Sequence, residues 1–230
     1  GSQGLTAGIF HRRSLSLMSK VGIPAGIQGC LFSLSNLAIQ GAINAYGSVV
    51  VAGSSAAGSI DGFIYVSMNT FHQTAQTFLS QNIGAGKYDR VKDILKKCLL
   101  CTVVTGAILS TVACVFSQPL LRIYNQDPAV VAAGTVRLYI AVAPYIIFGL
   151  ADVLTGAIRG CGSPVRPVVI NLLCTCVFRL LWIAAINTDT MPVTWVYASY
   201  PASWLVLLIA LTVCWLRLYR RKIRPHLTPD

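Results

Sequence analysis

The sequence predicts an all-α, polytopic membrane protein built as a bundle of six transmembrane helices. Hydrophobic residues make up 55% of the 230 residues, and only 11% are charged. A soluble domain usually carries about 25% charged residues. The chain also contains six apolar runs, each of which reaches the roughly 20 residues that a helix needs to cross the hydrocarbon layer. These features together place most of the chain in lipid.

The six expected helices are residues 21–46, 50–83, 95–117, 133–158, 165–186 and 192–218. The second run is longer than a bilayer requires, so it should tilt, bend or extend beyond the membrane. Its Gly53, Gly58 and Gly62 would allow close packing against a neighbouring helix. Pro144 lies inside the fourth run and predicts a kink there. Pro119 and Pro128 are expected to bracket the turn before that run.

The basic residues predict the orientation in the membrane. Of the 18 lysines and arginines, Arg122 and Arg137 are assigned to one side, Arg179 lies inside the fifth run, and the remaining 15 fall on the other side. Cytoplasmic loops carry the excess of Lys and Arg, so both termini should be cytoplasmic. We expect a basic cytoplasmic lead-in or linker at 1–20, a transmembrane lobe at 21–218 and a basic cytoplasmic tail at 219–230.

The net charge of +11 raises a second possibility, a nucleic-acid partner. Nucleic-acid-binding domains gather their cations in a stripe on a soluble fold. Here the cations lie between apolar runs, which is the pattern of membrane topology. We therefore expect the lipid bilayer of the cell membrane, and no nucleic acid, as the surroundings of this chain.

Polar side chains follow one face of the second run. Their spacings of four, four, three, four and four residues place them on a single helix face. A polar face is costly against lipid tails, so it should look toward protein or water. We interpret this face, a similar one on the first run and Tyr145 as walls of a solute pathway. The residues are Asp61, Tyr65, Asn69, His72, Gln76 and Ser80 on the second run and Gln28, Asn36, Gln40 and Asn44 on the first.

Ionisable residues inside the membrane are candidates for ion coupling. A buried Asp or Arg costs about 2.5–3.5 kcal/mol on insertion scales. Asp152 and Arg179 are the main candidates, either as a structural pair with each other or with Asp152 as a carboxylate that exchanges a proton. Histidine side chains in general titrate near neutral pH, but for His72 a hydrogen-bonded structural role is the stronger expectation.

Catalytic and metal sites are not expected. The eight cysteines lie mostly in apolar runs and fit small buried hydrophobes. Cys98 and Cys101 have a spacing that suits a metal or redox site, but no second pair accompanies them. No HExxH or GxSxG stretch occurs, and His72 has no evident partner in the sequence. The chain is therefore not expected to be an enzyme or to hold a cofactor, apart from Na⁺ or H⁺ as a coupling ion.

Four stretches carry a resemblance to the C-terminal half of the multidrug and toxic compound extrusion (MATE) transporters, and together they cover roughly 20–221. The resemblance implies twelve helices in two six-helix lobes around a central cavity. It also implies export of organic cations and other drugs, driven by inward Na⁺ or H⁺. The N-terminal lobe would be the partner of this chain. The stretches are VGIPAGIQ at 21–28, LSQNIGAGK at 79–87, VLTGAIRGCG at 153–162 and YPASW at 200–204.

Two departures from the family pattern affect the expected ion site. Some members carry an acidic residue in the first helix of this lobe, and here that helix has none. Some place an Asp three turns before the arginine that corresponds to Arg159, where this chain has Phe148. Asp152, two turns before Arg159, is our substitute together with the polar face of the second run. A flippase of lipid-linked precursors ranks lower, since it needs cations in the pathway and Arg179 is the only one well inside a run. A non-transporting structural half is the remaining alternative.

Overall fold

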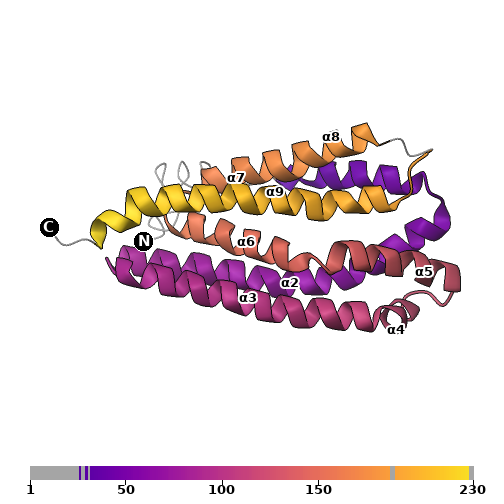
Figure 1. Cartoon of the computed structure of the whole chain (residues 1–230), viewed down its shortest axis with the longest axis horizontal. Coiled ribbons are helices and arrows are strands. Elements are labelled where there is room, and N and C mark those ends of the chain that lie inside the picture. Colours follow the sequence, from indigo (N-terminus) through magenta and orange to yellow (C-terminus); the bar gives the residue numbers. More distant parts are fainter. Residues whose placement is uncertain (1–25, 27–28, 31, 187–189, 228–230) are drawn as a thin grey trace, which may run out of the picture.

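The structure is a computed structural model that describes residues 26, 29–30, 32–186 and 190–227. This part of the chain consists of helices and turns, arranged as an elongated bundle (Figure 1). The all-α prediction is thereby confirmed. The helices are residues 32–44, α2 (Ser48–Gly84), α3 (Val91–Val115), α4 (Ser117–Arg122), α5 (Pro128–Arg137), α6 (Tyr145–Gly160), α7 (Val165–Asn171), α8 (Phe178–Ala185) and α9 (Thr194–Leu218).

Five of the expected spans can be compared with the structure. Four continuous helical segments of the described chain are long and apolar enough to cross a membrane, namely 48–84, 88–115, 165–185 and 194–226. The bent pair of 128–142 and 145–160 makes a fifth if it counts as one span. Residues 21–25, 27–28 and 31 of the first expected run lie outside the described residues, as does the lead-in at 1–20. Helical turns continue past α9 to His226, so the start of the basic tail is an extension of that helix.

Helix α2 runs through the bundle and contacts several other helices. Its 37 residues correspond to about 55 Å, well beyond the thickness of the hydrocarbon layer. The core of the bundle includes Met68 and Leu79 of α2 and Leu211 of α9, which are fully buried or nearly so. This position lets the polar face of α2 look into the bundle, while a different face, with Phe63 and Val66, reaches the surface.

Glycines set the close approach of α2 to its neighbours. A Cβ on Gly53 would lie 2.7 Å from the backbone nitrogen of Gly134, so α2 and α5 touch backbone to backbone. On α6, a Cβ on Gly160 would lie 2.7 Å from the backbone oxygen of Gln76. The packing role predicted for Gly53 is confirmed. For Gly62 it is wrong, because a Cβ there would meet no atom within 4 Å.

The fourth expected helix is broken, as Pro144 predicted. Helix α5 begins after Asp127, whose side chain accepts a hydrogen bond from the backbone N–H of Ala129 at 2.9 Å. A π-helical turn at Leu138–Val142 follows, and α6 starts just after Pro144 at an angle of 45°. The missing N–H of Pro144 explains the break. Pro119 lies inside α4, so the expectation that it brackets a turn is wrong.

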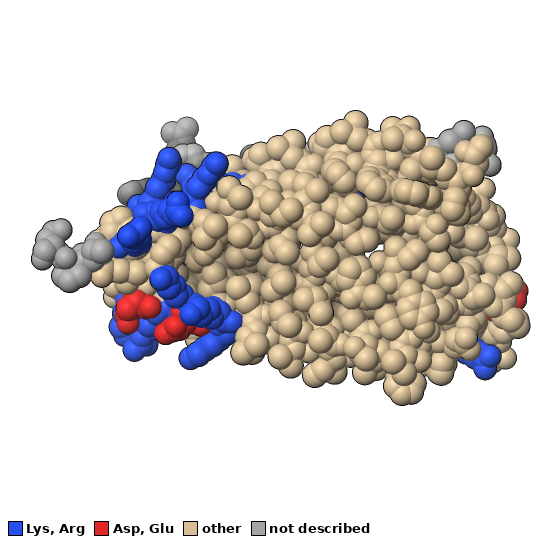
Figure 2. Space-filling view, viewed as in Figure 1, with Lys and Arg blue, Asp and Glu red and all other residues tan. Residues whose placement is uncertain are grey.

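The surface matches a protein surrounded by lipid. Leu100, Ile108 and Leu181 are more than half exposed and lie on the outer faces of their helices. Figure 2 shows lysines and arginines gathered at the end of the bundle where α9 finishes, with few charges on the rest of the visible face. This separation agrees with the charge asymmetry of the sequence. The cytoplasmic location of that end stays a prediction.

Candidate functional site

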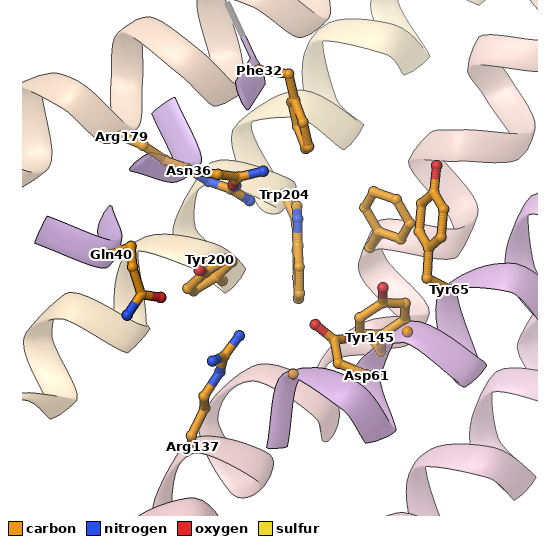
Figure 3. A pocket seen from close by; sticks show the side chains of 13 residues that line it. Phe32, Asn36, Gln40, Asp61, Tyr65, Arg137, Tyr145, Arg179, Tyr200 and Trp204 are labelled. Atoms are coloured by element: carbon orange, nitrogen blue, oxygen red, sulfur yellow. The ribbon is translucent and has the colours of Figure 1, made fainter. Parts of the chain in front are cut away.

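Two polar cavities lie side by side within the helical bundle. We call the first the arginine cavity. It measures about 380 Å³ and is lined by the helix at 32–44 and by α2, α5, α6, α8 and α9 (Figure 3). The second, the histidine cavity, measures about 370 Å³ and is lined chiefly by α2, α6 and α7. Phe32, Tyr65 and Phe148 line both, so the two cavities adjoin.

Two arginines and one tyrosine form one side of the arginine cavity. Arg179 of α8 is only 3% exposed, and its Nε–H donates to the hydroxyl of Ser203 at 2.9 Å. Arg137, at the end of α5, donates from Nη1 to the backbone carbonyl of Ser54. Both guanidinium groups lie over the Tyr200 ring, with their central carbons 4.6 Å (Arg179) and 5.9 Å (Arg137) from its centroid. Such cation–π contacts help to hold the two charges in place.

Asp61 is the acidic group of this cavity. Its carboxylate interacts with the Tyr145 hydroxyl and lies within electrostatic reach of Arg137 and Arg179. Its Oδ1 is buried and has no hydrogen-bond partner. Among the described residues, no carboxylate oxygen lies within the 4.0 Å of a salt bridge to either arginine. The cavity thus contains two positive groups and one negative group without a direct ion pair.

Aromatic rings form the opposite side of the arginine cavity. The Trp204 ring lies 5.2 Å from Tyr145, 5.5 Å from Phe148 and 6.0 Å from Tyr200, measured between centroids. Tyr65 is 5.9 Å from Phe148. These distances fall in the range of favourable tilted and edge-to-face pairs. The rings stabilise one another through these contacts, and they border the same cavity as Arg137, Arg179 and Asp61.

A hydrogen-bonded pair of side chains organises the histidine cavity. His72 Nδ1 and Asp152 Oδ1 are 2.8 Å apart, and their side chains are 5% and 16% exposed. An ionised carboxylate only accepts hydrogen bonds, so the His72 tautomer with a proton on Nδ1 fits this contact. The second oxygen, Asp152 Oδ2, is buried without a partner. Arg159 of α6 and Asn69 of α2 also line this cavity.

This pair corrects two expectations and confirms a third. Asp152 does not pair with Arg179, because Arg179 bonds Ser203 while Asp152 bonds His72. His72 does have a partner, which the sequence did not show because the two residues are 80 positions apart. The expectation of a hydrogen-bonded histidine is confirmed.

Most of the residues expected along the pathway meet at the two cavities. Gln76 lines neither, because α6 packs against that part of α2 at Gly160. Asn44 is exposed and accepts a hydrogen bond from Gln40 at 3.1 Å. Gln28 lies outside the described residues. The residues at the arginine cavity are Asn36, Gln40, Asp61, Tyr65, Tyr145 and Arg179, and those at the histidine cavity are Tyr65, Asn69, His72 and Asp152.

Sequence reasoning missed several lining residues. Arg137 was assigned to a loop side, whereas its long side chain reaches into the cavity from the end of α5. Tyr200 and Trp204 are four residues apart on α9, which is a signal for one helix face. Reading that face together with Arg179 would have found the aromatic side of the cavity. Arg137 carries no comparable periodic signal.

The cysteines take no part in either cavity. Cys98 is buried in α3 and Cys101 is exposed one turn later. Within the described residues, no three His, Cys, Asp or Glu side chains gather as a metal site would require.

Comparison with known proteins identifies the family. The MatE family profile matches residues 24–183. The probable multidrug resistance protein YoeA of Bacillus subtilis (strain 168) is 24% identical over 201 residues, which is 87% of this chain and 43% of YoeA. The FAD transporter of Shewanella oneidensis is 26% identical over 179 residues, 77% of this chain and 39% of that protein.

Solved structures agree on the fold. A mutant of the Vibrio cholerae MATE transporter VcmN superposes with a TM-score of 0.82 at 15% identity, covering 96% of this chain and 50% of VcmN. A MATE protein in complex with MaD3S gives a TM-score of 0.80 at 16% identity, covering 93% and 49%. The chain thus spans about half the length of its relatives. The family consists of membrane transporters and not of enzymes, and this chain belongs to it: it is a member of the MATE (MatE) transporter family.

Proposed function

We propose that this chain is one lobe of a secondary exporter that moves small organic solutes across the cell membrane. The observation that carries the proposal is the pair of polar cavities within a bundle whose outer faces are apolar. A polar face that only joined helices would be filled by side chains. Here the face of α2 from Asp61 to His72 borders open space of the size that binds small ligands.

The missing half of the pathway comes from a second lobe. The chain spans about half of each named relative, and transporters of this kind work by rocking one repeat against another around a central site. The N-terminal lobe of the same protein would close the cavities in one state and open them in the other. The relatives' names include multidrug resistance proteins and an FAD transporter, which supports small organic solutes as a class.

The histidine cavity supplies the coupling site in this proposal. Asp152 Oδ2 is buried without a hydrogen bond while Oδ1 is held by His72. A free carboxylate oxygen in such a place accepts either a proton or Na⁺ as an inward gradient drives the ion through. Binding of the ion reduces the negative charge of Asp152 and so weakens its hydrogen bond with His72.

The test uses the complete gene product that contains this chain, reconstituted in proteoliposomes. Solute accumulation is measured under an imposed pH gradient and, separately, under a Na⁺ gradient. Asp152→Asn should abolish accumulation under the active gradient and leave solute counterflow, which needs no ion gradient. Asp93→Asn is the matched control, because Asp93 is exposed near the start of α3 and lines neither cavity.

Two results would contradict this proposal. Absence of accumulation under both gradients, with folded protein inserted in the membrane, would overturn secondary export. Gradient-driven accumulation by Asp152→Asn at the unaltered rate would remove Asp152 from the coupling.

A flippase of lipid-linked precursors is the second candidate. The observation in its favour is that Arg137 and Arg159 line the two cavities together with Arg179, whereas the sequence placed Arg179 alone in the pathway. Selective movement of a phosphate-linked lipid between leaflets, without transport of soluble solutes, would favour it over export.

A further inference from the structure

We propose that the arginine cavity binds an aromatic organic anion, meaning a flat ring system that carries a carboxylate, sulfonate or phosphate group. The inference rests on the proposed export function and specifies the substrate class. It differs from the organic cations that the family resemblance implied. The reason lies in the charges and rings that the fold brings together at this one place.

The arginine cavity has more positive than negative groups, which favours an anionic ligand. Arg137 and Arg179 face a single acid, Asp61, and neither arginine has a salt-bridge partner among the described residues. Arg179 is 3% exposed, and a buried charge is costly unless an opposite charge compensates it. A bound anion supplies that compensation. A bound cation would instead add a third positive charge to a site with one carboxylate.

The two arginines of the cavity also have hydrogen-bond donors that the described part of the protein does not use. A guanidinium group carries five N–H donors in a planar fork that matches carboxylate and phosphate oxygens. Within the described residues, Arg179 hydrogen-bonds only through Nε and Arg137 only through Nη1. Figure 3 shows the two side chains entering the cavity from different walls, with Tyr200 between their ends. Their remaining donors are available to one anionic group bound near Tyr200.

The aromatic side of the arginine cavity suits a ligand with a flat ring. Trp204 and Tyr145 pack edge to face, Phe148 packs against both in tilted pairs, and all three border the same cavity as the two arginines. Aromatic rings bind flat apolar groups by offset or edge-to-face stacking. A ligand that fills about 380 Å³ can therefore place its ring against Trp204 and its anionic group near the arginines. A lipid with a phosphate headgroup shares the anionic part but has no ring for this side.

The experiment compares two dyes that share a xanthene ring and differ in charge, 6-carboxyfluorescein (anionic) and rhodamine 6G (cationic). Binding of each to the purified complete gene product is measured by fluorescence anisotropy, and transport of each is measured in proteoliposomes. The variants are Arg137→Gln and Arg179→Gln. Arg122→Gln is the control, since Arg122 is an exposed arginine on α4 that lines neither cavity.

We expect the protein to bind the anionic dye more tightly than the cationic one. Each cavity variant should weaken anion binding by about tenfold to a hundredfold, the range for losing a hydrogen bond to a charged group. Arg122→Gln should leave it unchanged. If Arg179→Gln does not fold, Arg137→Gln alone decides, because Arg137 is only partly buried.

The outcomes separate this inference from the proposed function. Tighter binding of the cationic dye, absence of binding by both dyes, or anion binding that survives Arg137→Gln unchanged would overturn the inference. Export of the cationic dye would then still support the proposed function. Binding of the anionic dye without its transport would support the inference and count against export. Two competitors of the bound anionic dye, 1-naphthoate and a phosphate-linked lipid, test whether the ligand needs an aromatic ring. Stronger displacement of the dye by the lipid than by 1-naphthoate would overturn the inference that the cavity selects an aromatic ligand.

Discussion

Replacing Gly156 by alanine should loosen the contact between α6 and α2 beside the hydrogen bond of His72 with Asp152. A Cβ on Gly156 would lie 3.1 Å from the backbone carbonyl carbon of His72, and its closest neighbour would be the carbonyl oxygen of the same residue. Backbone atoms cannot rotate away as a flexible side chain can. The helices must therefore separate, which moves His72 relative to Asp152.

Gly62→Ala is the matched control for this prediction. Both glycines lie in helices, so alanine brings the same gain in helix propensity, about 1 kcal/mol, at both positions. A Cβ on Gly62 meets no atom within 4 Å, so only Gly156→Ala suffers overpacking. Overpacking costs about 1–3 kcal/mol, and this is the expected difference in unfolding free energy between the two variants.

The assay is thermal unfolding of the purified complete gene product, followed by the fraction that remains monodisperse after heating. Because of this cost, Gly156→Ala should unfold at a lower temperature than Gly62→Ala. Gradient-driven transport should fall in Gly156→Ala as well. Equal Tm values for the two variants would refute the close backbone approach of α6 to α2.

Three further substitutions test other parts of the structure. Tyr197→Phe removes the partner of the buried Ser54 hydroxyl, 2.7 Å away, and should lower the unfolding free energy by about 1–3 kcal/mol, measured by the same heating assay. Asp127→Ala removes the N-cap of α5 and should cost about 1 kcal/mol in that assay, and an unchanged Tm would show that the cap is dispensable. Trp204→Ala should weaken binding of 6-carboxyfluorescein in the anisotropy assay. Trp182→Ala should not, because Trp182 of α8 lines neither cavity, and equal effects of the two variants would contradict a role of Trp204 in ligand binding.

The sequence predicted what depends on local periodicity. Spacings of three and four residues placed Asp61, Tyr65, Asn69 and His72 on one helix face, and the structure brings that face to the cavities. Pro144 predicted the bend because a missing backbone N–H acts on its own helix. Hydropathy predicted the spans because lipid demands long apolar helices. In each case the cause and the effect lie within one segment.

The features of the site that the sequence did not predict depend on contacts between segments that are distant in the sequence. His72 meets Asp152 across 80 positions, and no pattern in either helix indicates that pairing. Arg137 reaches the cavity through its long side chain from the last residue of α5, just before a π-helical turn begins. Gln76 has the right spacing but lies where α6 packs closely, so periodicity alone placed it in the pathway. Helix packing decided these three positions.

The central claim is that the polar face of α2 borders water while its exposed apolar face borders lipid. Single cysteines test it most directly, introduced after the native cysteines are replaced and probed in membranes with a hydrophilic, charged methanethiosulfonate reagent. Positions 61, 65 and 69 represent the cavity face. Phe63 and Val66, which are 73% and 66% exposed on the outer faces, represent the lipid side. The account predicts rapid modification at 61, 65 and 69 and slow modification at 63 and 66. Equal rates on both faces, or faster modification at 63 and 66, would contradict it.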